Sequence, residues 1–327
     1  MKKIPVLLDV DAGVDDTLAI IFALLSPLLD VKAITTVSGN VEVQQCTRNV
    51  LLTLQQLESV ISKLPVVGEG KKNPLQRKLF TAKEVHEKDG IGGATRFYSL
   101  KNNHPKIFDA EKIIVKTITS TPNITIIATG PLTNIASIIT KHQQVKKNIK
   151  EIVIMGGAFD GVHNTGPVAE FNFYVDPEAA DIVLNSGIPI RLIPLNVTEE
   201  CVFSPNDIQK IHNLSLKKYI ERVTKFYFQF HQRTENFLGG YLHDVLAVVA
   251  VTTPSLFKIK KGYVCVESNG KYARGLSIFF PQLNTKKEAE LPEWVKKKLQ
   301  KKPNVQVAHS VNAKKFKKIF LETLSKK

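Results

Sequence analysis

Short apolar runs alternate along the chain with longer segments in which apolar residues recur at helical spacing. The short runs predict buried strands, because strands of a parallel sheet are apolar on both faces. The longer segments predict helices that pack on these strands. We expect strands at residues 6–8, 31–37, 65–67, 124–128, 151–155 and 188–193, and the main helices at 17–25, 43–57, 109–120, 219–237 and 245–251.

This alternation of strands and helices predicts an α/β protein with an open, mostly parallel sheet and helices on both faces. Three later segments, 263–266, 275–279 and 305–308, are predicted as further strands that could pair antiparallel. No internal repeat is visible, and the lysine-rich stretch 284–304 interrupts the pattern without resembling a linker. We therefore expect residues 1–327 to form a single domain.

Polar residues follow several of the predicted strands. Asn40, Thr129, the glycine pair 156–157 and Asn196 all come directly after an apolar run. In open parallel sheets, ligands bind in the crevice beyond the carboxyl ends of the strands. These positions can therefore converge on one site.

The segment after the first strand carries four carboxylates, Asp9, Asp11, Asp15 and Asp16, within eight positions. Carboxylates this close repel one another in a buried crevice, so either some are neutral or a cation lies among them. Oxygen ligands of this kind suit a hard ion such as magnesium or calcium. The alternative is that Asp15 and Asp16 cap the following helix and that Asp9 and Asp11 are solvated.

Three segments carry a resemblance to a known family. Residues 9–16, Asp-Val-Asp-Ala-Gly-Val-Asp-Asp, resemble the N-terminal signature of the calcium-dependent, inosine–uridine-preferring nucleoside hydrolases. Residues 169–172, Ala-Glu-Phe-Asn, resemble the sugar-binding segment of that family, and Leu242-His243-Asp244 resembles a third motif. Val245 replaces the proline usual after that aspartate. The similarity extends from about residue 4 to residue 320 and is weakest in the lysine-rich stretch.

The resemblance implies a Rossmann-like fold and hydrolysis of the N-glycosidic bond of ribonucleosides to ribose and free base. It further implies that Asp11, Asp16, Asp244 and the backbone carbonyl of Thr129 bind Ca²⁺. Asp11 would also be the general base that activates a water at the ion. Relatives suggest a homodimer or a homotetramer.

The same resemblance assigns residues to the substrate. His243 is the predicted acid for the leaving base and His86 a second contributor, because histidine titrates near neutral pH. The choice between purine and pyrimidine bases stays open and depends on residues near His86, Tyr227, His231 and Tyr241. The predicted ribose-binding residues are Asp15, Asn40, Asn164, Glu170, Asn172 and Asp244.

Charge, cysteine content and the length of apolar runs indicate the cellular compartment and the kinds of partner. The formal charge is +15, but the lysines crowd into the C-terminal part without interleaved aromatic residues or a nucleic-acid-binding motif, which favours a solvated helical face. The three cysteines are widely spaced, which favours a reducing compartment. No apolar run approaches the ~20 residues that span a bilayer. We expect a cytoplasmic protein with no nucleic-acid or membrane partner.

Two other functions are compatible with parts of the sequence. A magnesium-dependent phosphohydrolase of the haloacid dehalogenase type also begins with a strand and Asp-x-Asp, but Gly13 occupies a position where that family has Thr or Val. A non-catalytic nucleoside or nucleic-acid binder would agree with the charge. The intact carboxylates and histidines argue against lost catalysis.

Overall fold

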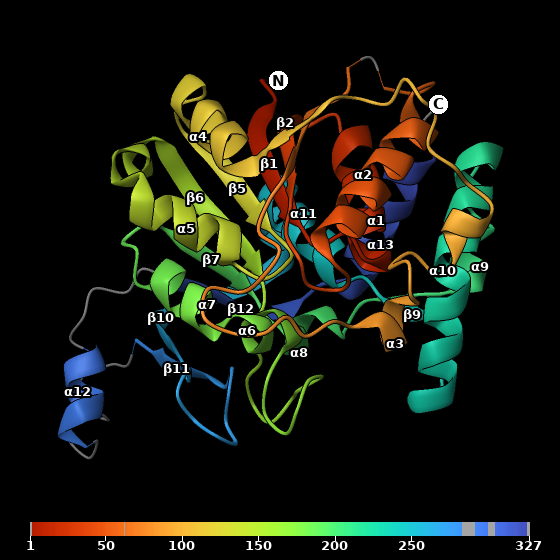
Figure 1. Ribbon diagram of the computed structural model, residues 1–327. Helices are drawn as coiled ribbons and strands as arrows, with labels where there is room; N and C mark the ends of the chain where they lie inside the picture. Colours follow the sequence, from red (N-terminus) through yellow and green to blue (C-terminus); the bar gives the residue numbers. More distant parts are fainter. Residues whose placement is uncertain (1, 62, 283–291, 300–304, 326–327) are drawn as a thin grey trace.

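The computed structural model describes residues 2–61, 63–282, 292–299 and 305–325, and one sheet runs through it (Figure 1). The strand order is β11-β10-β12-β7-β6-β5-β1-β2-β3-β4. All neighbouring pairs are parallel except those that involve β10, which is antiparallel to both β11 and β12. The strands are β1 (Ile4–Val10), β2 (Leu29–Thr36), β3 (Val66–Glu69), β4 (Ile107–Asp109), β5 (Ile124–Ala128), β6 (Ile149–Met155), β7 (Ile190–Ile193), β10 (Phe257–Val266), β11 (Ser277–Pro281) and β12 (Val305–Val311).

Helices cover both faces of this sheet, as Figure 1 shows. One face packs against α4 (Ala110–Ser120), α5 (Thr133–Lys141) and α7 (Pro177–Leu184). The other packs against α1 (Val14–Leu25), α2 (Val43–Leu57), α11 (His243–Thr252) and α13 (Ala313–Leu324). The remaining described helices are α3 (Lys83–His86), α6 (Phe171–Val175), α8 (Leu195–Thr198), α9 (Pro205–Ile208), α10 (Leu214–Thr234) and α12 (Glu293–Leu299).

The first strand shows why its sequence lacks polar alternation. Leu7 is fully buried in the core on the α4 and α5 side, and its neighbour Leu8 is buried in the core on the α1 and α11 side. Both faces of β1 are therefore inside the protein, as in other parallel sheets with helices on both sides. The predicted fold class is confirmed.

The late part of the chain differs in detail from the prediction. The expected antiparallel pairing holds for β10 with β11 and for β10 with β12. However, β12 also pairs parallel with β7, so the last strand lies inside the sheet. The predicted helix 219–237 is α10, which begins earlier, at Leu214, and ends at Thr234. Much of the lysine-rich stretch 284–304 lies outside the described residues.

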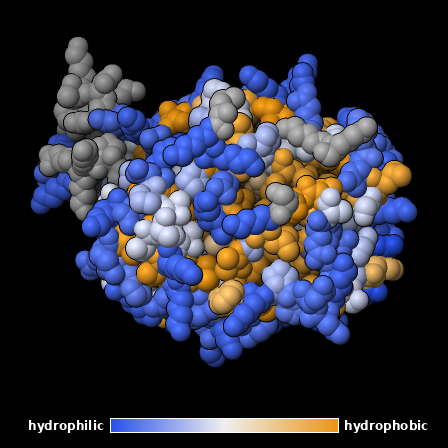
Figure 2. All heavy atoms as spheres, turned by 90° about the horizontal axis from the view of Figure 1, so that it is seen from above, coloured by the Kyte–Doolittle hydropathy of each residue, from blue (hydrophilic) through white to orange (hydrophobic). Residues whose placement is uncertain are grey.

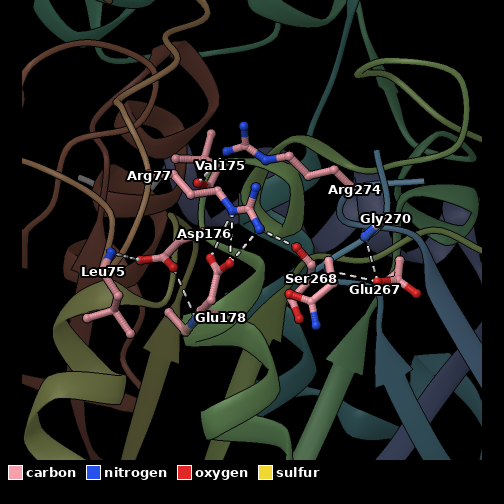
Figure 3. Close-up of polar contacts among 11 residues, drawn as sticks. Leu75, Arg77, Val175, Asp176, Glu178, Glu267, Ser268, Gly270 and Arg274 are labelled. Atoms are coloured by element: carbon pink, nitrogen blue, oxygen red, sulfur yellow. Dashed lines mark hydrogen bonds and ion pairs between the residues drawn. The ribbon is translucent and has the colours of Figure 1, made fainter. Parts of the chain in front are cut away.

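An arginine fixes the long segment between β3 and α3. Arg77 makes a bidentate ion pair with Glu178 of α7, at 2.6 to 3.1 Å, and also donates to the Ser268 carbonyl (Figure 3). Two residues earlier, the Leu75 N–H donates to Asp176 at 2.9 Å. This segment leads directly to His86, so the network fixes one wall of the region beyond the strand ends.

The two ends of the sheet differ in character. Figure 2 looks onto the end where β1 begins and shows hydrophilic residues over much of that face, with hydrophobic residues gathered near its middle. The loops at the opposite end follow the carboxyl ends of β1, β2, β5 and β6, and they carry the predicted site. No helix in the described ranges is long and apolar enough to cross a membrane.

Candidate active site

Carboxylates from distant parts of the chain meet beyond the end of β1. Carboxylate oxygens of Asp15, Asp16 and Asp244 lie within 4.8 Å of one another. The packing of α1 against α11 brings their amino-terminal turns together, because Asp15 and Asp16 are in the first turn of α1 and Asp244 in that of α11. The Gly13 N–H donates to Asp16 Oδ2 at 2.8 Å and fixes that side chain. The predicted meeting of Asp16 with Asp244 is therefore found.

Asp11 and Asp9 have different surroundings although they lie on the same strand end. Asp11 Oδ2 accepts the Asn40 N–H at 2.8 Å. Asp9 Oδ1 accepts from the Thr35 hydroxyl at 2.6 Å and from the Asn134 amide at 2.8 Å. Asp9 thus fixes strand and helix ends, whereas Asp11 faces the carboxylate cluster.

Buried like charges change the acidity of this cluster. Burial, followed by the charge of Asp16, raises the pKa of Asp11 well above its ordinary value and that of Asp15 from 3.8 to about 7. Burial and the charge of Asp15 likewise raise the pKa of Asp244. Burial raises the pKa of Asp16, against the hydrogen bond from Thr129. Ionising all four carboxylates together is unfavourable unless a cation binds among them.

The donor set fits a hard divalent cation. Asp11 Oδ1 is buried and has no hydrogen-bond partner among the described residues, although the other oxygen of the same carboxylate is bonded. The Thr129 hydroxyl donates to Asp16 Oδ1 at 2.7 Å, which brings the backbone of Thr129 beside the carboxylates. Carboxylate and carbonyl oxygens are the ligands that calcium and magnesium prefer.

A polar wall adjoins the cluster. The Asn172 amide donates to the Thr129 carbonyl at 2.8 Å and to the Met155 carbonyl at 3.1 Å. Glu170 accepts three backbone N–H groups, from Gly157, Asn172 and Phe173, at 2.8 to 3.1 Å, and it caps α6. Burial raises the pKa of Glu170 to about 7 despite these bonds.

Asn164 is more exposed than Glu170 and Asn172 in the same wall. The side-chain Oδ1 of Asn164 accepts the Phe171 N–H at 2.9 Å. The side chain therefore holds the 158–170 loop against α6.

A second wall consists of aromatic and imidazole side chains. The rings of His86 and Tyr227 stack at 5.6 Å, and the rings of Tyr241 and His243 lie 5.3 Å apart. Burial lowers the pKa of both His86 and His243 to about 3. Both are neutral at pH 7, which contradicts the expectation that they titrate near neutrality.

Hydrogen bonds indicate which nitrogen carries the proton in each neutral imidazole. The Val14 N–H donates to His86 Nδ1 at 3.1 Å, so the proton of His86 is on Nε2. His243 Nδ1 lies 2.7 Å from the Thr198 hydroxyl, which donates to the Leu195 carbonyl at 3.0 Å. Since that hydroxyl has one hydrogen, His243 Nδ1 is the donor of its pair and His243 Nε2 is an acceptor.

These walls enclose a cavity of about 500 Å³. Asp16 is behind the lining and fully buried, and the expected Asn196 does not line the cavity. In the described part of the chain, no lysine or arginine lines it. The predicted residues that do line it are Asp11, Asp15, Asn40, His86, Thr129, Asn164, Glu170, Asn172, His243 and Asp244.

The cavity also has residues that sequence reasoning did not assign. Glu199 and Glu235 line it, together with Phe80 and Phe230. Burial, followed by the charge of Glu235, raises the pKa of Glu199 to about 7. Glu199 follows β7 and is three residues after Asn196. Its position after a predicted strand could therefore have marked it as a candidate site residue. No such signal marks Glu235 and Phe230, because a sequence does not show which face of α10 lines a cavity.

A carboxylate cluster able to hold a cation, between a polar wall and an aromatic one at the carboxyl end of a parallel sheet, is typical of metal-assisted hydrolases of the α/β class. The family model of the inosine-uridine preferring nucleoside hydrolases matches residues 6–318, and the chain belongs to this family. It is therefore a hydrolase that acts on the N-glycosyl bond of ribonucleosides. The predicted resemblance is confirmed, and the phosphohydrolase alternative has no such support.

Relatives and solved structures agree with this assignment. The chain is 38% identical to a pyrimidine-specific ribonucleoside hydrolase of Salmonella arizonae over 279 residues, which are 84% of this chain and 88% of the relative. A plant nucleoside hydrolase superposes with a TM-score of 0.88 at 32% identity, over 100% of both chains. A purine-preferring ribonucleoside hydrolase from Gardnerella vaginalis gives a TM-score of 0.85 at 29% identity, over 98% of both chains.

Proposed function

We propose that the chain hydrolyses free ribonucleosides with a bound calcium ion, with Asp11 as general base. The observation that carries this proposal is the convergence of Asp11, Asp15 and Asp244, with Asp16 directly behind them, at one cavity with polar and aromatic walls. Polar and aromatic side chains in one cavity suit a ligand that has both a hydroxylated ring and a flat base.

The charge of the cavity supports a nucleoside over a nucleotide. Its described lining includes the carboxylates of Glu84, Glu199 and Glu235 but no lysine or arginine. Phosphate recognition normally uses arginine, lysine or a helix amino terminus. A 5′-phosphate would add negative charge to a cavity that is already lined by carboxylates.

The proposed calcium ligands are Asp11, Asp16, Asp244 and the carbonyl of Thr129, with Asp15 in the same cluster. When bound, the ion would supply positive charge that lowers the pKa of a nearby water and attracts sugar hydroxyls. Ionised Asp11 accepts a proton from the attacking water. Glu170 and Asn172 orient the sugar while positive charge develops at C1′.

The leaving base takes negative charge as the C1′–N bond breaks. His86 presents Nε2–H to the cavity side and donates a hydrogen bond to the base at neutral pH. His243 stays a candidate for proton transfer, but its bond to Thr198 leaves Nε2 as an acceptor in the neutral form. The water oxygen bonds to C1′ as the C1′–N bond breaks, Asp11 keeps the proton of that water until it is released to solvent, and the departing base takes up one proton from solvent.

Nucleoside hydrolysis with and without chelator tests the proposal. Uridine, cytidine, inosine and guanosine are incubated with protein in EDTA, and with protein to which calcium or magnesium is returned, and released base is measured by chromatography. We expect hydrolysis with calcium and none in EDTA. Full activity in EDTA, or activity restored by magnesium alone, contradicts the calcium assignment. Uridine 5′-phosphate is the matched control and should stay intact.

The names of the relatives point to different bases, pyrimidine-specific in one case and purine-preferring in another. The panel therefore includes both classes. A homodimer or homotetramer and a cytoplasmic location stay predictions, and light scattering after gel filtration tests the first.

A further inference from the structure

Asn49 of α2 bonds to two loops that carry residues of the candidate site. The side chain is completely buried, and its Nδ2 donates to the Ala12 carbonyl at 3.0 Å and to the Asp89 carbonyl at 2.8 Å. Ala12 directly follows Asp11 in the turn before α1. Asp89 is three residues after His86. One amide group therefore joins the carboxylate side of the cavity to the loop that carries one of its histidines.

The direction of this amide follows from its three hydrogen bonds. The two carbonyls can only accept, so the group between them is the NH₂ and both of its hydrogens are used. Gln45, one turn earlier on α2, donates to Asn49 Oδ1 at 2.8 Å and satisfies the other end. The side chain is thus fully bonded, and its position on a packed helix gives the two loops a fixed point of attachment.

The turn that Asn49 holds has a strained backbone. Ala12 has a φ of 28°, in the left-handed region that is unfavourable for a residue with a Cβ. Such a conformation persists only when its surroundings enforce it. Helix α2 does so twice, since Cys46, three residues before Asn49, donates from Sγ to the Asp11 carbonyl at 3.0 Å. Two successive carbonyls of the turn are therefore bonded from one face of α2.

The loop after His86 is braced by its own hydrogen bonds. The Gly92 N–H donates to the His86 carbonyl at 3.0 Å. The Asp89 carboxylate accepts three backbone N–H groups of the same loop at 2.9 to 3.0 Å, from Ile91, Gly93 and Thr95. A Cβ at Gly90 would lie 3.0 Å from Asn49 Nδ2, so glycine there lets the loop approach α2 closely. The bond from Asn49 therefore bears on the whole loop, including His86.

We propose that Asn49 is a positioning residue that sets the place of His86 relative to the turn bearing Asp11. The inference rests on the proposed nucleoside hydrolysis, in which Asp11 activates water and His86 binds the leaving base. The N–H of Val14, the first residue of α1, donates to His86 Nδ1 at 3.1 Å and joins the two parts inside the site. A shift of either part breaks this bond, and misplacement of a reacting group by about 1 Å can lower a rate about 10²-fold.

Asn49→Leu tests the proposal, because leucine is close to asparagine in size but has no hydrogen to donate. We expect kcat/KM for uridine or inosine to fall about 10- to 100-fold. An unchanged kcat/KM would show that neither part depends on Asn49, and the proposal would be wrong. Asn49→Ser is a second, smaller variant in case the leucine protein does not fold. Its single hydrogen can serve at most one carbonyl, so kcat/KM should fall about 5-fold or more.

Thr53→Val is the matched control on the same helix. Thr53 is buried one turn after Asn49, and its hydroxyl bonds to the Asn49 carbonyl at 2.8 Å and to the Tyr219 hydroxyl at 3.1 Å rather than to either loop. Loss of this hydroxyl should lower the midpoint of thermal unfolding and leave kcat/KM unchanged. An equal fall of kcat/KM in both variants would mean that Asn49 only stabilises α2, which contradicts the proposal.

Hydrogen exchange of the Val14 amide gives a readout that needs no turnover. Backbone N–H groups in the first turn of a helix have no partner within the helix, so exchange at Val14 reports its bond to His86. We expect Asn49→Leu to speed this exchange about 10-fold or more, with the Ser26 amide at the other end of α1 unchanged.

This measurement separates failure of the inference from failure of the proposed function. Unchanged exchange at Val14 in Asn49→Leu overturns the positioning role even if nucleosides are hydrolysed. Faster exchange in that variant, with no hydrolysis by the wild-type protein, supports the positioning role and refutes the proposed function.

Discussion

Substitution of Asp15 by asparagine should stabilise the metal-free protein while it damages the site. The pKa of Asp15 is raised from 3.8 to about 7 by burial and by Asp16. In the folded state this carboxyl binds its proton more tightly than in the unfolded state, so stability falls as the pH rises from 3.8 through 7. Each tenfold change in proton affinity is worth about 1.4 kcal/mol, so ionised Asp15 costs about 4 kcal/mol above pH 7. An asparagine amide that is imperfectly bonded there costs about 2 kcal/mol, which leaves a gain of about 2 kcal/mol.

Urea unfolding in EDTA measures this gain. We expect Asp15→Asn to be more stable than the wild type at pH 8 and to lose the advantage at pH 5, where the wild-type carboxyl is protonated. Asp30→Asn, on the surface with a side chain 43% exposed, is the control and should change stability little at either pH. With excess calcium the advantage of the variant should shrink, because a bound cation beside Asp15 offsets the cost of ionising its carboxylate. A variant that is less stable than wild type at pH 8 in EDTA, or that gains equally at pH 5, would refute the reasoning.

Three further outcomes follow from the same structure. Asp11→Asn should lower kcat about 10²- to 10⁴-fold with an unchanged far-ultraviolet circular dichroism spectrum, because a general base is lost from an intact fold; near-normal turnover would exclude Asp11 as the base. Gly39→Ala should weaken calcium binding in calorimetry, because the added Cβ would lie 2.0 Å from Asp11 Oδ2 and must displace it; unchanged affinity would contradict the ligand assignment. His142 and Lys141 hold the pKa of Glu111 at about 2, below its usual 4.5, so this partly exposed network stabilises the protein above pH 4.5 and loses that effect as the pH falls towards 2. Glu111→Gln should therefore cost about 1 kcal/mol in urea at pH 7 and little at pH 2.5, and an equal cost at both would point to packing instead.

Elements with a strong local signal could be predicted from sequence. The apolar run before Asp9 gives β1, and the segment 43–57 gives α2 with the predicted bounds. The position of β12 could not be predicted, because its insertion beside β7 depends on pairing with a segment more than a hundred residues earlier in the chain. Local periodicity does not encode such pairing.

The residues of the site likewise divide into those whose placement could be predicted from sequence and those whose placement could not. Carboxylates after strands were expected to converge, and those of Asp16 and Asp244 do. The separate surroundings of Asp9 and Asp11 were not foreseeable, because residues two apart on a strand project to the same side and only tertiary neighbours distinguish them. The low pKa of His243 also escaped prediction, since it depends on burial that a sequence does not show.

The last helix has a consequence for how the protein is synthesised. Phe320 of α13 packs against Phe22 of α1 with ring centroids 6.1 Å apart, and α1 carries Asp15 and Asp16. On the ribosome, the helix that bears these carboxylates must wait for almost the entire chain before its partner emerges. Until Val305–Val311 has also been made, β7 and β10 expose backbone edges that can pair with other nascent chains. A prematurely terminated product should therefore aggregate and depend on chaperones, even though every residue of the proposed catalytic centre has already been translated.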